Sequence, residues 1–180
     1  MKFIYSVVGI ALAWILLFSL NNLAFSHLEL SQFVNWVFLP AGIRLVAVLL
    51  FDSVAIVGLF VGAMMTSDFS HLALQHILVI SAISAVNPYI AVKISKYFLN
   101  IDNLLSNLRP SQLLVLCLTA AVFNSVAHML YLNAIRVDDA PFKDSMTMMI
   151  GDFFGCLLML LTCAFAIKLI RKYVATDRQS

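Results

Sequence analysis

Long apolar runs dominate this sequence, and they constrain its fold more than any other feature. The longest runs are Phe3 to about Phe25, His71 to about Phe98, Ser111 to Ile135 and Ser145 to Ile170. A membrane-spanning helix needs about 20 consecutive apolar residues, so each run predicts one span. Only 11% of the 180 residues are charged and 63% are hydrophobic, whereas soluble domains have about 25% charged residues. We therefore expect an all-α fold, a polytopic membrane helix bundle.

Two shorter apolar segments lie between the first two long runs, at residues 39–51 and 54–66. Pro40 suits the first turn of a helix, because its missing N–H would have no partner there. A helix of about 13 residues reaches only about 20 Å, less than the bilayer core of about 30 Å. Short helices are tolerated at membrane depth where protein or water surrounds them. We predict about six transmembrane segments, including these two, in one domain over residues 1–180.

The two ends of the chain suggest its orientation. Residues 1–26 are either a retained first helix or a signal peptide, because Ala24-Phe25-Ser26 resembles a cleavage site. Residues 173–180 form a short basic tail. Basic residues gather near this tail and around residues 100–109, where we predict a short interfacial helix. Cytoplasmic loops are enriched in Lys and Arg, so the C-terminus is predicted to be cytoplasmic.

Opposite charges fall at one predicted depth in two of the segments. Arg44 lies about six residues from the outer end of its segment and Asp152 about seven from the outer end of the last span, which places both roughly 10 Å deep. A charge at the membrane centre costs about 2.5–3.5 kcal/mol on insertion scales and is usually paired. We therefore predict an ion pair and contact between the second and last segments.

Three further polar residues are candidates for the same region. His128 is expected roughly 13 Å below the outer surface, and Asn87 and Asn124 roughly 20 Å below it, where they would floor a pocket that opens outward. Two interpretations remain open. In one, the pair only fixes the register of the helices. In the other, Arg44 binds a small anionic ligand while Asp152 and His128 titrate.

Small residues form a second pattern. Gly58 and Gly62, and likewise Gly151 and Gly155, have the G-x-x-x-G spacing that lets helix backbones approach closely, either within one chain or between two copies. The three cysteines lie inside apolar runs without ligand spacing, so we expect no metal and no cofactor. The charge pattern does not support nucleic-acid binding.

Several of these residues resemble the MASE1 integral membrane sensory domain. The resemblance covers about Asn35 to Tyr173 and rests on Pro40-Ala-Gly-Ile43, the two short helices after it, and Gly151-Asp-Phe-Phe-Gly155. It implies shared functional elements at Pro40, Ala41, Gly42, Gly151, Asp152 and Gly155. Arg44 is not part of the family pattern, and Asp52 stands where the family usually has glycine.

The resemblance implies a sensor of the bacterial inner membrane. In that family the domain is the N-terminal sensor of proteins that continue into diguanylate cyclase, phosphodiesterase or histidine kinase domains. Only about ten residues follow the last predicted span, so we expect signalling through a protein partner. No motif of a catalytic site occurs. We predict a non-enzymatic sensory or regulatory protein, with a small transporter or substrate-capture subunit, and a structural subunit of a membrane complex, as alternatives.

Overall fold

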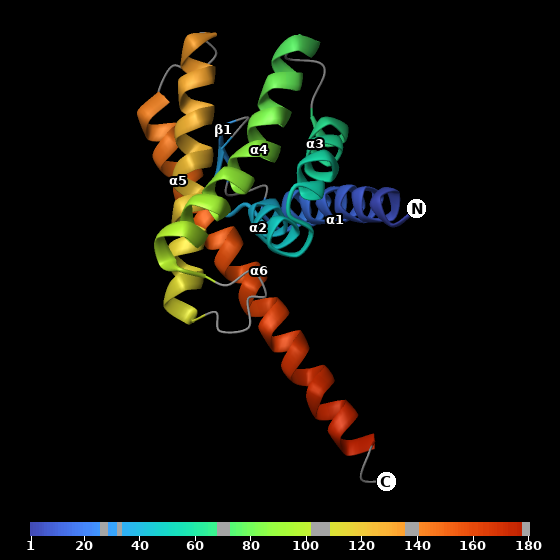
Figure 1. Ribbon diagram of the computed structural model, residues 1–180. Coiled ribbons are helices and arrows are strands. Elements are labelled where there is room, and N and C mark those ends of the chain that lie inside the picture. The colour runs from blue at the N-terminus through green and yellow to red at the C-terminus, as the bar shows by residue number, and fades with distance from the viewer. Residues whose placement is uncertain (26–28, 32–33, 68–72, 102–108, 136–140, 178–180) are drawn as a thin grey trace.

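The computed structural model describes residues 1–25, 29–31, 34–67, 73–101, 109–135 and 141–177. These residues form six helices and one short pair of strands (Figure 1). In chain order they are α1 (Lys2–Phe25), β1 (Glu29–Ser31), β2 (Val34–Asn35), α2 (Pro40–Phe51), α3 (Val54–Thr66), α4 (Leu74–Leu99), α5 (Pro110–Ala134) and α6 (Pro141–Asp177). The fold is helical throughout apart from the small ribbon, as the sequence predicts.

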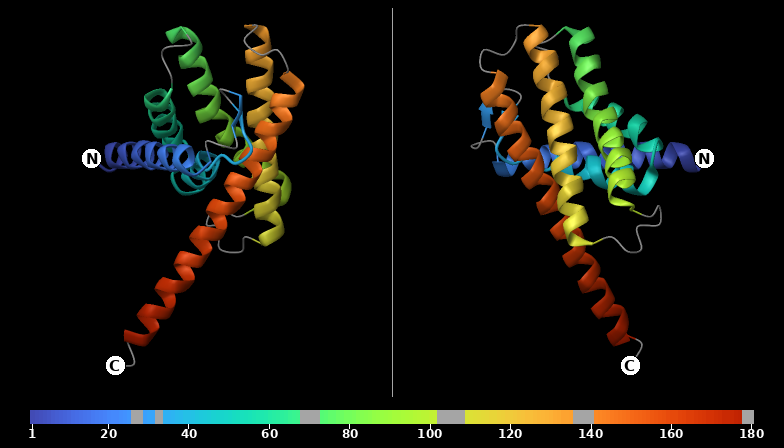
Figure 2. Two further views of the ribbon diagram at one scale, coloured as in Figure 1. Left: turned by 180° about the vertical axis from the view of Figure 1, so that it is seen from behind. Right: turned by 60° about the vertical axis from the view of Figure 1, so that its left-hand side comes forward.

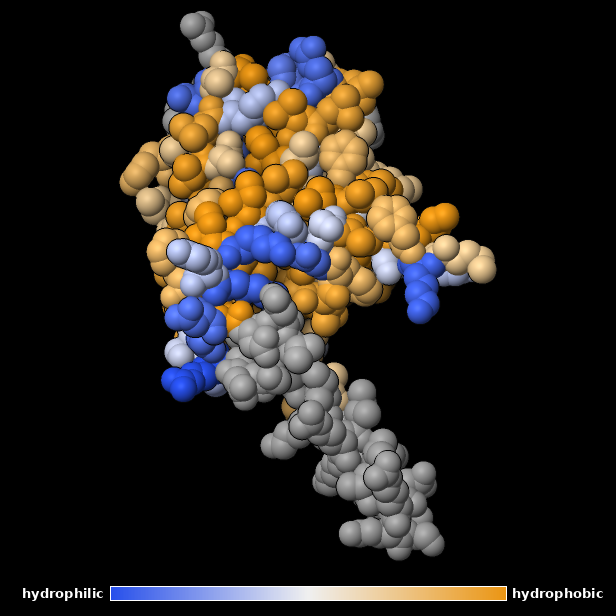
Figure 3. Space-filling model, in the orientation of Figure 1, coloured by the Kyte–Doolittle hydropathy of each residue, from blue (hydrophilic) through white to orange (hydrophobic). Residues whose placement is uncertain are grey.

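Four of the helices are long and apolar enough to cross a membrane: α1, α4, α5 and residues Phe142–Cys163 of α6. Helices α2 and α3 are apolar but shorter, with 12 and 13 residues. The predicted apolar segments are therefore all helices, and the two short ones begin and end within one residue of their expected bounds. Figure 3 shows hydrophobic residues over most of the visible face of the molecule.

The helices do not form a simple parallel bundle. Helices α4 and α5 pack side by side, and α6 packs on α5 (Figures 1 and 2). Helix α1 runs across these helices rather than alongside them in every view, and it packs mainly on α3. Helix α2 contacts α1, α3, α4 and α6. The last part of α6 continues beyond the other helices toward the C-terminus (Figure 1).

Glycines make the contact between α1 and α3 possible. A Cβ added at Gly58 would lie 2.7 Å from Ile10 Cβ, and one added at Gly62 would lie 2.8 Å from Trp14 Cβ. Real Cβ atoms do not approach so closely, so both positions require glycine. The G-x-x-x-G spacing in α3 therefore serves packing within the chain.

The first turn of α2 is fitted against α6 in the same way. A Cβ at Gly42 would collide with the Met159 side chain, and a Cβ at Gly155 would collide with the Phe38 carbonyl group. The Phe38 backbone N–H donates to the Gly151 carbonyl oxygen at 3.1 Å. Pro40 and Ala41 are buried in this turn. The two motifs of the family resemblance thus contact each other directly.

The segment before α2 forms an antiparallel ribbon that the sequence did not predict. Glu29 pairs with Asn35 and Ser31 with Val34 across β1 and β2. Two other expectations lie partly outside the described residues: the interfacial helix at 100–109 and the end of the basic tail. Residues 173–177 of that tail belong to α6.

Candidate functional site

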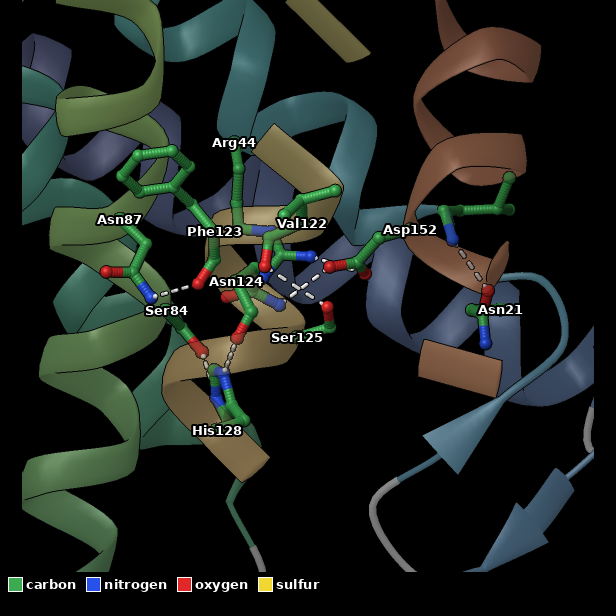
Figure 4. A network of polar contacts seen from close by, with 11 residues as sticks. Asn21, Arg44, Ser84, Asn87, Val122, Phe123, Asn124, Ser125, His128 and Asp152 are labelled. Atoms are coloured by element: carbon green, nitrogen blue, oxygen red, sulfur yellow. Dashed lines mark hydrogen bonds and ion pairs between the residues drawn. The ribbon is translucent and has the colours of Figure 1, made fainter. Parts of the chain in front are cut away.

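Arg44 and Asp152 form a buried ion pair between α2 and α6. Arg44 Nη2 lies 2.6 Å from Asp152 Oδ1, and the two side chains are only 4% and 2% exposed. The predicted contact between these segments is confirmed (Figure 4). The close approach of the helices at Gly42 and Gly155 brings the guanidinium and the carboxylate together, because Arg44 and Asp152 are only two and three residues from these glycines.

Asn124 of α5 completes the coordination of the carboxylate. Its Nδ2 atom donates to Asp152 Oδ2 at 2.6 Å, so each carboxylate oxygen accepts a hydrogen bond from a different helix (Figure 4). Asp152 thereby joins α2, α5 and α6. We refer to Arg44, Asn124, His128 and Asp152 as the polar cluster.

The sequence placed Asn124 about 10 Å deeper than Asp152, and this estimate was wrong. Helix α6 begins at Pro141 rather than at Ser145, so Asp152 lies 11 residues in, roughly 16 Å. Helix α5 ends at Ala134, and Asn124 lies 10 residues before it, roughly 15 Å. Helix α2 begins inside the protein, beside Gly151, so its start does not mark a membrane surface.

Two aromatic rings flank the guanidinium group. The Arg44 Cζ atom lies 5.5 Å from the centre of the Phe38 ring and 5.9 Å from that of Trp14. Both distances are within the range of cation–π attraction. The charge of Arg44 is therefore stabilised by the carboxylate and by the electron-rich faces of two rings.

His128 belongs to the same buried layer. Among the described residues, its hydrogen bonds go to other groups than the Asp152 carboxylate. Its Nδ1 atom lies 2.9 Å from the Asn124 carbonyl oxygen, one turn earlier in α5, and its Nε2 atom lies 3.3 Å from Ser84 Oγ of α4. Asn87 lies apart from the ion pair, because its Nδ2 atom donates to the Phe123 carbonyl oxygen at 3.4 Å (Figure 4). Both residues connect α4 with α5.

A small cavity adjoins the ion pair, and its volume is about 10 Å³. Arg44, Asp152, Asn124 and Cys156 line it together with small residues, Pro88 among them. Asn124 Oδ1 is buried and has no hydrogen-bond partner among the described residues. A space of this size holds about one water molecule. At the ion pair, the structure has only this small space where the sequence predicted a pocket that opens outward with Asn87 and Asn124 as its floor, and Asn124 lines it whereas Asn87 does not.

Three residues with clear roles were not predicted from the sequence. Asn21 of α1 is buried and accepts a hydrogen bond at 2.8 Å from the Leu39 N–H, at the start of α2. Trp14 covers Arg44 and donates to Thr66 Oγ1 at 2.9 Å, and Ser84 contacts His128. The polar pair Asn21-Asn22 inside an apolar run was a detectable signal.

Comparison with known proteins identifies one family. The MASE1 family model matches residues 5–175, nearly the whole chain. Searches of curated proteins and of solved structures each found no match.

Proposed function

This chain belongs to the MASE1 family of membrane sensory domains, and from that premise we propose that it is a non-enzymatic sensory protein of the bacterial inner membrane. The state of the polar cluster would control how α2 packs on α6. The observation that carries this proposal is the position of Asp152, whose carboxylate joins three helices at once.

A carboxylate in this position can act as a switch because its contacts depend on its charge. When Asp152 is ionised, it attracts the Arg44 guanidinium and accepts from Asn124. When it is protonated or displaced, Arg44 becomes an unpaired buried charge, which is strongly unfavourable. The helices would then adopt a different packing that relieves this cost. A sensor needs such a pair of states with different affinities for the cue.

The size of the cavity favours a proton or a water-sized molecule as the direct cue at the cluster. A space of about 10 Å³ holds neither a carboxylate nor a phosphate ligand while the helices are closed. A small anion could still compete for the Arg44 guanidinium in an opened state, since guanidinium groups bind such anions with two parallel hydrogen bonds.

We propose that helix α6 transmits the change at the polar cluster to a protein partner. It carries Asp152 and continues to Asp177, well past the apolar window that ends at Cys163. A helix of 37 residues is roughly 55 Å long, longer than a bilayer core of about 30 Å. A shift of α6 against α2 would therefore reach the cytoplasmic side, where a protein partner would respond to it.

The proposal is tested by a distance measurement in lipid nanodiscs. Spin labels at Ser53, in the exposed turn after α2, and at Phe165, on the exposed side of α6, report the separation of the two helices. We expect Asp152→Asn to shift the distance distribution. Thr162→Val is the matched control, because Thr162 is exposed and, among the described residues, its hydroxyl donates to the Leu158 carbonyl of its own helix and to no other group. Identical distributions for the wild type and Asp152→Asn would leave the cluster with a structural role only.

A further inference from the structure

Helices α1 and α2 leave an open apolar groove between them, of about 370 Å³. It is lined by Tyr5, Ser6, Gly9, Ile43, Val46 and Leu50, among others. We call it the α1–α2 groove. The groove exists because α1 directs Ile10 and Trp14 at the glycines of α3, whereas nothing lies within 4 Å of a Cβ added at Gly9. Ala13 and Ala47 line the groove further along, and their small side chains fill little of its volume.

The chemistry of the groove fits a linear apolar molecule. Tyr5 and Ser6 are the only polar side chains among the described residues that line it, and both lie toward one end of α1. A polar ligand would lose its hydrogen bonds to water there without replacement. The volume is within the range of about 300–1,000 Å³ typical of ligand sites. The walls belong to helices of a membrane protein, so lipid acyl chains are the molecules that reach them.

A positive charge lies near the end of the groove where Tyr5 and Ser6 are, and it favours some lipid headgroups over others. Lys2 precedes Tyr5 by three residues, Ser6 by four and Gly9 by seven, so it lies on the face of α1 that lines the groove. Lys2 is exposed. Phe51, the last residue of α2, also lines the groove and is followed by Asp52. The carboxylate of Asp52 already pairs with Lys93, whose Nζ atom lies 2.8 Å from it. Lys2 thus adds a positive charge without a neutralising partner among the residues that line the groove, which favours an anionic headgroup.

From these observations we infer that the α1–α2 groove binds one acyl chain of an anionic phospholipid, with the headgroup at Lys2. Two residues that line the groove are neighbours in the chain of residues at the polar cluster. Ile43, in the groove, precedes Arg44, and Ala13, in the groove, precedes Trp14, whose ring lies 5.9 Å from the Arg44 Cζ atom. Lipid in the groove therefore sets the spacing between α1, which carries Trp14, and α2, which carries Arg44. Only this last link rests on the proposed function.

Native mass spectrometry of the full chain, titrated with phosphatidylglycerol or with phosphatidylcholine of the same acyl chains, tests the inference. We expect one phosphatidylglycerol to be retained per chain and to bind more tightly than phosphatidylcholine. Gly9→Phe places a ring in the groove and should weaken binding about tenfold, the change expected when contact with about two methylene groups is lost. Lys2→Gln should abolish the preference between the two lipids while leaving acyl-chain binding intact.

Val8→Phe is the matched control, because Val8 is the neighbouring residue, is 49% exposed and does not line the groove. The inference is overturned if Gly9→Phe retains lipid as the wild type does, or if Val8→Phe loses it equally. Equal binding of the two lipids by the wild type, or a dimer that Gly9→Phe abolishes, would also overturn it. The readout is lipid mass, so it is independent of the spin-label distance. If phosphatidylglycerol binds as expected but Asp152→Asn leaves the spin-label distance unchanged, the proposed function is contradicted and the groove site still stands.

Discussion

At the scale of single residues, the unusual feature is how completely the charge of Arg44 is satisfied inside an apolar protein. The carboxylate of Asp152 lies on one side and the rings of Trp14 and Phe38 lie on others. Cation–π contacts contribute about 2 kcal/mol each when they are shielded from water. These surroundings are asymmetric, so exchanging Arg44 and Asp152 would place a carboxylate against two electron-rich rings. Charge exchange is therefore expected to restore the fold only in part.

Asp52 leads to a prediction at the same scale. It has φ = 51° and ψ = −128°, a backbone conformation that glycine adopts readily and that costs other residues about 1–3 kcal/mol. We expect Asp52→Gly to be more stable than Asp52→Ala by about 1 kcal/mol in the free energy of unfolding, since both variants lose the ion pair with Lys93 and only alanine keeps the strain. Unfolding in detergent micelles measures this difference.

Lys93→Gln is the control for the ion pair. Both side chains of the pair are about half exposed, so we expect its loss to cost less than about 1 kcal/mol. Equal stability of the glycine and alanine variants would mean that the turn does not keep its positive φ. Asp52 stands where the resembled family usually has glycine, which agrees with the backbone conformation observed here.

The candidate site was predictable in part. Arg44 and Asp152 could be paired from sequence because a buried charge requires a partner, and Asp152 is the one acidic residue within the predicted last span, 145–170. Asn124 could not be assigned to the carboxylate, because the depth estimate assumed that every apolar run starts at a membrane surface. Asn21 was missed for a different reason. Its partner is the backbone N–H of Leu39. Every residue except proline has such a group, so the residue types do not indicate which one Asn21 binds.

At the scale of elements, the decisive contact is the one between the first turn of α2 and the middle of α6. We predict that Gly155→Ala lowers the free energy of unfolding by about 1–3 kcal/mol, the usual cost of overpacking, because the added methyl group collides with the Phe38 carbonyl. It should also separate Arg44 from Asp152, which lies in the same turn of α6. Unfolding in detergent micelles gives the first quantity.

Gly9→Ala provides the comparison for this substitution. Gly9 is also inside an apolar helix, but its added Cβ meets nothing within 4 Å. Alanine there should be neutral or stabilising by up to about 1 kcal/mol, because alanine favours the helix. Similar losses in both variants would show that helix propensity, rather than the contact with Phe38, governs the effect.

The positions of the helices were well predicted because apolar runs interrupted by polar residues and proline determine them. The predicted span 111–135 corresponds to α5 at Pro110–Ala134, and 54–66 corresponds to α3. The last span was predicted at 145–170, whereas α6 extends from Pro141 to Asp177. Hydropathy detects only the apolar part of a helix. Polar residues at both ends continue the same helix outside that window.

At the scale of the whole molecule, the sequence could not predict the course of α1. Hydropathy treats α1 as one more span, yet it runs across α4 and α5 (Figure 2). Its direction is set by the packing of Ile10 and Trp14 on the glycines of α3, a tertiary contact. This crossing places Trp14 beside Arg44 and leaves the α1–α2 groove open.

The orientation of the molecule gives a prediction that reporter fusions can check. The excess of basic residues near the end of α6 predicts a cytoplasmic C-terminus. A green fluorescent protein fused there should fluoresce in bacterial cells, and alkaline phosphatase fused at the same point should be inactive. An active phosphatase together with a dark fluorescent fusion would reverse the proposed direction of signalling.

The most direct test of the account is a double-mutant cycle on the ion pair, measured as free energies of unfolding in detergent micelles. Arg44→Met and Asp152→Leu should each destabilise the protein by about 3–5 kcal/mol, because each leaves an unpaired buried charge. The double variant should be destabilised by less than the sum of the two single losses, with a coupling energy of at least about 2 kcal/mol. The loss of the Asn124 contact occurs in both Asp152 variants and cancels in the cycle. Additive losses, with a coupling energy near zero, would contradict the claim that this pair holds α2 against α6.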